Sequence, residues 1–349
     1  MHFGTYHTFQ CPPWTTPGDV FREEMERVHL SEELGYASVW VPEQHFFDYC
    51  LCGDALQMAA YIVGQTRRVR VGTAIVNLTF THPLRFAERV AILDQIGGGR
   101  VDVGVGRGYQ WPQYPVMGVD IEKTREIFDE SLDVILQAWQ PAEFAHHGDY
   151  YDIPPVRIWP VPERGPDEVL LHASASPTSM DKSIARGIPA IFSNFVPIEA
   201  EAASFREYRS KLEATDLDVD WMVRRSTVMR YVFVADSKEE ARALSKKPFE
   251  WQMARFNALT TAPEGQAISS YAMYDREKRA ESIPDIAYDQ WNETILVFDD
   301  PDGCTEKLMH LRDAGVENVV LWMGVGGMAH EHVVRSMQLF AEKVMPHFG

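Results

Sequence analysis

Residues 69–106 of the chain, VRVGTAIVNLTFTHPLRFAERVAILDQIGGGRVDVGVG, decide the fold. Two apolar runs, at 69–78 and 100–106, have the composition of β-strands, and the segment 83–96 between them carries apolar residues at helical spacing. Strands that read as nearly continuous apolar runs are buried on both faces, as in a parallel sheet. The stretch therefore predicts a strand, a crossover helix and a second strand that runs parallel to the first.

The same alternation continues on both sides of this unit. Six further apolar runs are each accompanied by a helical segment: HFGTYHTF at 2–9, ASVWV at 37–41, EVLLHAS at 168–174, IPAIFSNF at 188–195, STVMRYVFVA at 226–235 and VENVVLWM at 316–323. Eight strand candidates without a linker-like break favour one closed barrel over an open sheet. We therefore predict an α/β fold, a (β/α)8 TIM barrel with insertions at its C-terminal face, as a single domain over residues 1–349.

A glycine-rich turn at 104–110, GVGRGYQ, raises the alternative of a dinucleotide-binding sheet. That fingerprint needs a glycine where this chain has Tyr109, and it follows the first strand of such a sheet, whereas this turn follows the fourth. The barrel therefore stays the preferred prediction.

Composition and charge restrict the partners. The chain has 51 acidic and 33 basic side chains and a net charge of -18, so neither nucleic acid nor an anionic membrane is expected to bind. Because no run of about 18 apolar residues and no signal-peptide pattern is present, we expect a cytoplasmic protein. The four cysteines do not make a disulfide framework, and Cys50 and Cys52 are one residue too close for a C-x-x-C motif, so no metal site is predicted.

Polar residues follow the predicted strands at the end where a barrel enzyme has its active site. Glu43, Gln44 and His45 come after the second strand, the turn 107–109 comes after the fourth, and the serines of 174–179 come after the fifth. These polar groups are expected to converge on one mouth of the barrel.

Two of these segments indicate a phosphate site. Arg107 lies between two glycines, and its planar guanidinium can bind phosphate oxygens while the glycines let the backbone approach closely. SASPTS at 174–179 predicts a helix start with Pro177 in the first turn, where free backbone N–H groups favour phosphate. Together they predict a phosphorylated ligand. The alternative is that Arg107 pairs with a carboxylate in the mouth and the serines only cap a helix.

Residues 260–291 show no clean periodicity and are rich in proline, glycine, serine and charged residues. Their length and their place before the last strand indicate a mobile active-site lid. A solvated excursion without a role is the alternative.

The chain resembles the bacterial luciferase-like, flavin-dependent monooxygenase family over nearly its whole length. The resemblance rests on GYASVWVPEQHF at 35–46, on residues 69–110, on HASASPTS at 172–179 and on GGMAHEHVVRSMQLFAEKVMP at 326–346. It implies a barrel that binds reduced FMN from a separate NAD(P)H:flavin reductase, forms a flavin C4a-(hydro)peroxide with O2 and oxygenates an apolar small organic substrate. Hydride transfer with the deazaflavin F420 and a non-catalytic flavin-binding subunit are the alternatives.

The resemblance also assigns roles to individual residues. It implies a cofactor site made of Glu43 beside the flavin ring, Ala74 and Ile75 joined by a cis peptide bond beneath it, and Arg107, Gly108, Tyr109, Arg125, Ala175, Ser176 and Ser179 at the phosphate. Ala175 stands where the luciferase has an acidic residue, which weakens that contact.

The family motif Glu-His-His-Phe reads Glu43-Gln44-His45-Phe46 in this chain. Gln44 replaces the general base of the luciferase, and an amide does not titrate near neutral pH. Gly106 likewise replaces a cysteine near the flavin, and both changes argue against long-chain aldehyde bioluminescence. The catalytic candidates are Gln44, as a hydrogen-bonding group, and His45, as an acid or base. A buried histidine bonded to the backbone is the alternative for His45.

Two further expectations concern the pocket wall and assembly. Family members are commonly dimers, so residues 54–65 and 83–96 are the expected interface of a homodimer. Aromatic residues near strand ends are expected to line an apolar pocket: Trp40, Phe46, Phe47, Phe80, Tyr109, Trp111 and Phe195.

Overall fold

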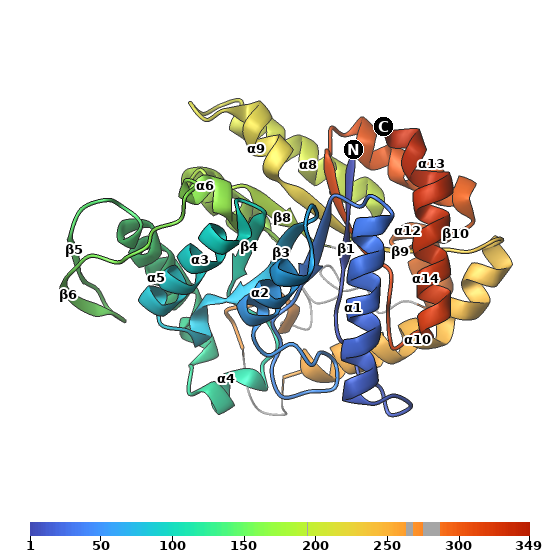
Figure 1. Ribbon diagram of the computed structural model, residues 1–349, viewed down its shortest axis with the longest axis horizontal. Coiled ribbons are helices and arrows are strands. Elements are labelled where there is room, and N and C mark those ends of the chain that lie inside the picture. The colour runs from blue at the N-terminus through green and yellow to red at the C-terminus, as the bar shows by residue number, and fades with distance from the viewer. Residues whose placement is uncertain (194, 263–267, 275–286) are drawn as a thin grey trace.

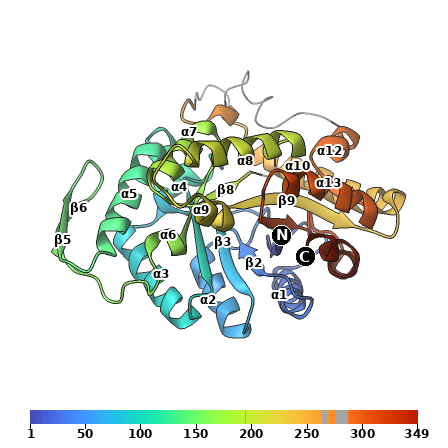
Figure 2. The ribbon, with the colours of Figure 1, turned by 90° about the horizontal axis from the view of Figure 1, so that it is seen from above.

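Eight parallel β-strands form a closed barrel with helices on its outside. The computed structural model describes residues 1–193, 195–262, 268–274 and 287–349. The strands follow one another around the barrel in the order β1 (His2–Tyr6), β2 (Ser38–Val41), β3 (Arg70–Asn77), β4 (Val101–Gly106), β7 (Leu170–Ala173), β8 (Ala190–Phe192), β9 (Thr227–Val234) and β11 (Asn318–Trp322). Figure 2 shows the strands at the centre and the helices around them. The predicted barrel and its eight strands are therefore confirmed.

The ring closes through two backbone ladders. β8 pairs with β9 at Ile191 and Thr227, and β11 pairs with β1 at Val319 and Phe3. Every pairing within the barrel is parallel. The carboxyl ends of all eight strands therefore meet at one end, which we call the mouth, and their amino ends meet at the other, which we call the floor.

Helices between the strands cover the outside of the barrel (Figure 1). The longer ones are α1 (Pro17–Glu33), α2 (Ala55–Gln65), α3 (Pro83–Gly97), α5 (Thr124–Ala138), α7 (Pro177–Ala185), α8 (Ile198–Leu212), α10 (Lys238–Leu259), α13 (Pro301–Asp313) and α14 (His330–Leu339). Local chemistry fixes several ends. Thr16 caps α1 and Asp300 caps α13, each followed by a proline at the first helical position. α3 ends at Gly98, whose φ of 57° lies in the left-handed region that favours glycine.

Apolar side chains fill the barrel from both sides of its wall. Outward-facing strand residues such as Val103 and Val105 are fully buried in the layer beneath the helices. The interior holds a small cluster made of Trp40, Leu171, Ile191 and Val320. Gly72 leaves room for the Trp40 ring, because a Cβ at Gly72 would lie 2.3 Å from it. The barrel is therefore a packed core and not a pore.

Some regular structure lies outside the predicted pattern. β10 (Val297–Asp299) pairs with the end of β9, and β5 (Phe144–His147) and β6 (Asp152–Val156) form an antiparallel hairpin away from the barrel (Figure 1). β10 is short, and β6 contains Pro154 and Pro155, which strand patterns tolerate only at edges. The shorter helices are α4 (Gln113–Met117), α6 (Pro166–Val169), α9 (Val219–Arg225) and α12 (Tyr288–Thr294).

The predicted lid at 260–291 corresponds only in part to described structure. α10 ends at Leu259, and α12 begins at Tyr288, inside the predicted segment. The lid itself stays a prediction. Residues 263–267 and 275–286 lie outside the described residues.

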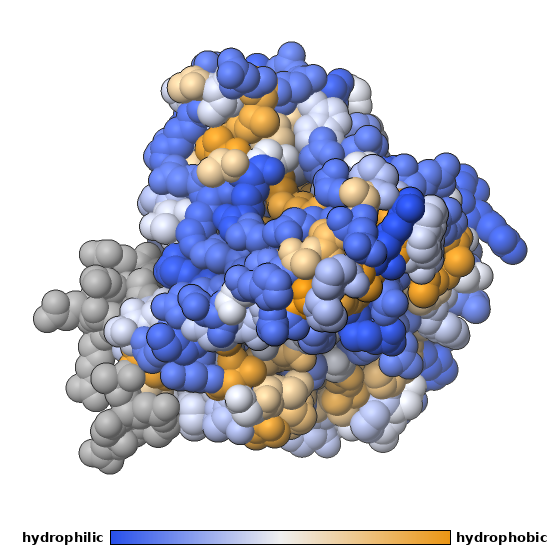
Figure 3. Space-filling view, turned by 90° about the vertical axis from the view of Figure 1, so that its left-hand side faces the viewer, coloured by the Kyte–Doolittle hydropathy of each residue, from blue (hydrophilic) through white to orange (hydrophobic). Residues whose placement is uncertain are grey.

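The two termini lie side by side at the floor, where the Met1 ammonium donates a hydrogen bond to the Phe348 carbonyl at 2.7 Å (Figure 1). The face that carries the β5–β6 hairpin is mostly hydrophilic, with apolar side chains in separate patches (Figure 3). Within the described part of the chain, no helix combines the length and the apolar character needed to cross a bilayer.

Candidate active site

The site residues predicted from the sequence lie at the mouth, which faces down in Figure 1, on the side of α4. Residues 43–45 follow β2, Ala74 and Ile75 lie in β3, residues 107–109 follow β4, and residues 175–179 follow β7. Because β2, β3, β4 and β7 are consecutive neighbours in the barrel, these four segments share one half of the mouth.

Glu43 is buried and joins the ends of two strands to a helix. Its Oε1 accepts a hydrogen bond from the Asn77 backbone N–H at 3.0 Å, and its Oε2 accepts a longer one, 3.4 Å, from the backbone N–H of Ala55, the first residue of α2. A carboxylate at a helix N-terminus is favourable because the first N–H groups of the helix have no partner within it. Glu43 therefore holds β2, β3 and α2 together at the mouth, a role that sequence patterns did not predict.

Gln44 belongs to a network of buried amides. Nε2 of Gln113 donates to Oε1 of Gln44 at 2.9 Å and to Oε1 of Gln110 at 2.7 Å. Nε2 of Gln44 lies 3.4 Å from the Tyr109 hydroxyl, to which it donates. Burial raises the pKa of Tyr109 to about 12, so this phenol stays neutral at physiological pH. The groups that surround Gln44 in this network therefore hydrogen-bond without carrying charge.

His45 lies beside Glu43 and Phe80, and one of its ring nitrogens is unpaired among the described residues. Its Nε2 lies 3.7 Å from Oε1 of Glu43, which is too long for a hydrogen bond, and this buried atom has no hydrogen-bond partner among the described residues. The ring packs edge-on against Phe80, with centroids 5.6 Å apart. Nε2 thus lacks the backbone hydrogen bond that the structural alternative required.

The Ala74–Ile75 peptide bond is cis, as the resemblance implies. The Ala74 carbonyl accepts a hydrogen bond from the Tyr6 hydroxyl at 2.7 Å. On the neighbouring strand, a Cβ at Gly106 would lie 3.0 Å from Cδ1 of Ile75. The absence of a side chain at Gly106 therefore leaves space for Ile75 inside the mouth.

Arg107 directly follows β4 and has no countercharge among the described residues. None of the described carboxylates forms an ion pair with it; instead its guanidinium carbon lies 4.1 Å from the ring centroid of Tyr271. Its Nη1 makes one long hydrogen bond, 3.5 Å, to the Ser270 carbonyl. Among the described residues, Arg107 therefore does not pair with a carboxylate in the mouth, as the alternative required. Gly108 has a φ of 73°, and a Cβ there would lie 2.5 Å from Oδ1 of Asn77, so only glycine suits this turn.

Tyr271 belongs to residues 268–274, which we call the strap. The backbone N–H and the hydroxyl of Ser269 each donate to Glu122 at 2.7 Å, and the Tyr274 hydroxyl donates to the Tyr109 carbonyl. The strap therefore joins the turn after β4 to the start of α5. Sequence analysis missed Tyr271 and Tyr274; their signal is the pair of tyrosines three positions apart in SSYAMY at 269–274.

The predicted helix start at Pro177 is confirmed, with Ser176 and Ser179 as its capping box. Oγ of Ser176 accepts from the Ser179 backbone N–H at 3.3 Å, and Oγ of Ser179 accepts from the Ser176 backbone N–H at 2.9 Å. Ala175 and Ser176 are exposed, and Arg125, the second residue of α5, is half-buried. Among the described residues, no hydrogen bond joins Arg125 or Ser176 to Arg107.

Aromatic rings line the opposite half of the mouth. Phe195 after β8 packs on Phe256 of α10 with centroids 4.7 Å apart, and Tyr109 lies 5.7 Å from the same ring. Trp40 is a correction to the predicted wall, because its ring lies in the barrel interior and its Nε1 donates to Oγ of Ser38 at 2.8 Å. The ring can lie there because its neighbours Gly4 and Gly72 have no side chains and leave space for it.

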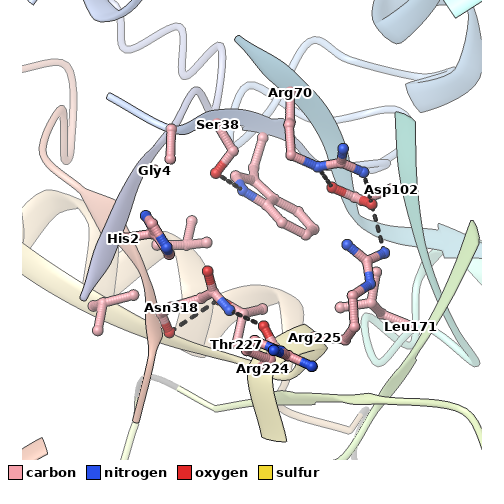
Figure 4. A pocket seen from close by; sticks show the side chains of 14 residues that line it. His2, Gly4, Ser38, Arg70, Asp102, Leu171, Arg224, Arg225, Thr227 and Asn318 are labelled. Atoms are coloured by element: carbon pink, nitrogen blue, oxygen red, sulfur yellow. Dashed lines mark hydrogen bonds and ion pairs between the residues drawn. The ribbon is translucent and has the colours of Figure 1, made fainter. Parts of the chain in front are cut away.

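A cavity of about 290 Å³ lies at the floor, the opposite end from the predicted site. Figure 4 shows Arg70 and Arg225 converging on the Asp102 carboxylate in its wall. Both guanidinium groups approach this carboxylate to 2.6 Å, so each of the two arginines has a carboxylate partner here. Because this end of a barrel usually contributes stability and not catalysis, we place the active site at the mouth.

The mouth suits a planar cofactor that carries a phosphate. Arg107 offers N–H donors without a competing carboxylate among the described residues, and the glycine turn exposes backbone beside it. Ile75 and the aromatic rings supply apolar surface for a ring system. Fold and site together describe a barrel enzyme whose mouth has an arginine without a carboxylate partner among the described residues and aromatic rings in its wall.

The chain belongs to the luciferase-like monooxygenase family, whose model matches residues 1–318. The alkanal monooxygenase alpha chain of Photobacterium leiognathi is 26% identical over 348 residues, 97% of either chain. The oxygenase component of the flavin-dependent trigonelline monooxygenase of Acinetobacter baylyi is 23% identical, and the match covers 100% of this chain and 96% of that one. An uncharacterized protein of Sinorhizobium fredii is 34% identical over 168 residues, about half the length of each chain (48%). The predicted family and enzyme class are confirmed.

Solved structures show the same fold. The monooxygenase RslO1 from Streptomyces bottropensis superposes with a TM-score of 0.84 at 24% identity, covering 100% of both chains. The oxygenating constituent of 3,6-diketocamphane monooxygenase of Pseudomonas putida, in complex with FMN, has a TM-score of 0.78 at 19% identity over 99% of this chain and 98% of that one. An F420-dependent secondary alcohol dehydrogenase has a TM-score of 0.74 at 16% identity over 100% and 99%.

Proposed function

We propose that the protein is the oxygenase component of a two-component, FMNH2-dependent monooxygenase that oxygenates an apolar small organic substrate with O2. The observation that carries the proposal is Arg107, a half-buried cation at the mouth without a carboxylate partner among the described residues. A phosphate is the anion that this geometry fits best, because a guanidinium binds two phosphate oxygens at once. A relative that is itself an oxygenase component supports a separate NAD(P)H:flavin reductase as partner.

Residues of the first half of the mouth would hold the cofactor. We assign the phosphate to Arg107, Arg125, Ser176 and Ser179, with Ala175 and the backbone of Gly108 and Tyr109 beside it, and the ring to Glu43, Ala74 and Ile75. Bound FMNH2 supplies the two electrons with which O2 is activated.

Gln44 and His45 would act next to the ring. Gln44 is fixed by Gln113 and can hydrogen-bond an oxygen of the substrate without exchanging a proton near neutral pH. His45 keeps Nε2 free and can hold or deliver a proton at that atom. The strap and the aromatic rings would keep bulk water away from the place where O2 is activated, which limits the loss of hydrogen peroxide in place of oxygen transfer.

The test is anaerobic binding of FMNH2 to the wild-type protein and to Arg107→Ala. We expect the dissociation constant to rise at least about tenfold, since a charge-assisted hydrogen bond contributes about 1.5–3 kcal/mol. Arg22→Ala, on an exposed face of α1 and outside the helices proposed for the dimer interface, is the matched control and should bind as the wild type does. An unchanged constant in Arg107→Ala would contradict the phosphate assignment.

Mixing the reduced, loaded protein with O2 separates the proposal from its alternatives. Consumption of O2 with oxygen transfer to an added apolar ketone or aldehyde supports a monooxygenase. Binding of FMNH2 without O2 consumption beyond that of free FMNH2 supports a non-catalytic flavin binder. Tighter binding of reduced F420 than of FMNH2 supports the F420-dependent alternative.

We also propose a cytoplasmic homodimer that packs through α2 and α3. Tyr61 on α2 is 54% exposed, and Ile92 and Ile96 on α3 are 49% and 63% exposed. Large apolar side chains that gather on neighbouring helices indicate a protein interface. The four cysteines are free thiols, which suits a reducing compartment.

A further inference from the structure

We propose that Tyr271 positions Arg107 for recognition of the cofactor phosphate, which rests on the function proposed above. Tyr271 lies 164 positions after Arg107 in the chain, and the Arg107 guanidinium carbon lies over its ring, 4.1 Å from the centroid. The guanidinium also makes a long hydrogen bond, 3.5 Å, from Nη1 to the Ser270 carbonyl. Both contacts come from the strap.

Stacking determines which part of the guanidinium stays available. The group is planar, its N–H bonds point outward in that plane, and its two faces have no hydrogen-bonding capacity. An aromatic ring on one face is attracted through the cation–π interaction without using any N–H donor. Tyr271 thus holds the plane of Arg107 in one orientation and leaves its edge for the two oxygens of a phosphate.

The Tyr271 ring is itself fixed at its hydroxyl. That hydroxyl lies 3.1 Å from the Tyr114 hydroxyl and 3.2 Å from Oγ1 of Thr124. The Tyr114 hydroxyl donates to the Arg107 carbonyl at 2.7 Å. Three contacts therefore form a closed series, which we call the circuit: the Arg107 carbonyl to Tyr114, Tyr114 to Tyr271, and Tyr271 to the Arg107 guanidinium.

This circuit connects two elements to which we assign the phosphate. Thr124 is the first residue of α5 and directly precedes Arg125. Tyr271 touches both Thr124 and Arg107, so it fixes the end of β4 relative to the start of α5. The two residues before Tyr271 hold the strap in place, through Ser269 to Glu122 and through Ser270 Oγ to the Ile121 carbonyl at 3.0 Å.

The experiment compares the binding of FMN and of riboflavin, which has the same ring system but no phosphate, to full-length variants. In Tyr271→Ala we expect the FMN dissociation constant to rise about threefold to tenfold, in line with a partly desolvated cation–π contact, and the riboflavin constant to stay within about twofold. Tyr271→Phe keeps the stacked ring and should restore most of the FMN affinity. Tyr274→Phe is the control, since it removes a hydrogen bond of the strap without touching the Arg107 side chain.

A double-mutant cycle decides whether Tyr271 acts through Arg107. In an Arg107→Ala background, Tyr271→Ala should leave the FMN constant unchanged, because the stacked partner is already gone. Equal losses for FMN and riboflavin in Tyr271→Ala, or additive losses in the cycle, would overturn the positioning role. If wild-type protein bound FMN no better than riboflavin, the proposed phosphate site itself would fail, whatever the Tyr271 variants did.

Discussion

His172 gives the fold a pH dependence that can be worked out from its surroundings. The residue lies on β7 and packs edge-on against Phe128 of α5, with ring centroids 5.3 Å apart and only 3% of its surface exposed. Its Nε2 has no hydrogen-bond partner among the described residues. Burial, followed by the nearby Arg186 guanidinium, lowers the pKa of His172 from 6.5 to about 4.

The sign of the effect follows from proton binding in the two states. Below pH 6.5 the unfolded chain binds a proton at His172, whereas the folded protein does so only below about pH 4. The stability that neutral His172 contributes is therefore fully present above pH 6.5 and is lost as the pH falls toward 4. One pKa unit corresponds to about 1.4 kcal/mol, so the interval from 6.5 to about 4 is equivalent to roughly 3 kcal/mol. That is a large part of a typical net stability of about 5–15 kcal/mol.

Urea unfolding at several pH values between 4 and 7 measures this contribution. His172→Phe and His172→Gln remove the titrating group, so the difference in unfolding free energy between wild type and each variant should move by about 3 kcal/mol across this range, in favour of the variant at low pH. His347→Gln, which removes an exposed imidazole, is the control and should parallel the wild type. Parallel curves for the wild type and both His172 variants would refute the reasoning.

Three further changes have defined outcomes. Asp102→Asn leaves Arg70 and Arg225 without their countercharge and should lower the free energy of unfolding in urea by about 2–3 kcal/mol. The loss is smaller than for a fully buried ion pair because the Arg70 side chain is 35% exposed. An unchanged urea midpoint would contradict this prediction. Gln44→His places an imidazole in the amide network and should add an ionisation near pH 6–7 to the rate of substrate oxygenation; an identical pH profile would place residue 44 away from the reacting atoms. Ile96→Lys charges the most exposed isoleucine of α3 and should convert dimer to monomer in sedimentation analysis; an unaltered mass would place the interface elsewhere.

The barrel could be predicted because its strands are buried on both faces. Such strands read as continuous apolar runs, and each of the eight runs corresponds to one barrel strand. β10 was not predicted because it has only three residues and ends at Asp299, and β6 was not predicted because two prolines interrupt its pattern. Short or edge strands depend on tertiary contacts that local patterns do not encode.

The sequence predicted where the site residues lie in the barrel better than it predicted which groups they contact. Parallel topology alone places Glu43, Gln44 and Arg107 at the mouth, because each follows a strand end. The ring that covers Arg107 could not be derived in this way, since Tyr271 comes from a segment without periodicity and far away in sequence. The burial of Glu43 between two backbone N–H groups likewise depends on how β3 and α2 meet, which only the folded chain determines.

The arginines at the two ends of the barrel have different partners, and this difference supports a ligand at the mouth. At the floor, Arg70 and Arg225 share Asp102, and Arg164 approaches Asp94 to 2.7 Å. At the mouth, none of the described carboxylates pairs with Arg107, whose guanidinium carbon lies over the Tyr271 ring. A partly desolvated cation without a countercharge costs free energy, so such an arrangement is retained where a ligand supplies the anion. Because the net charge of -18 repels anions at long range, we expect the proposed phosphate to be bound through short, directed hydrogen bonds, which require a guanidinium whose edge is free and whose plane is held.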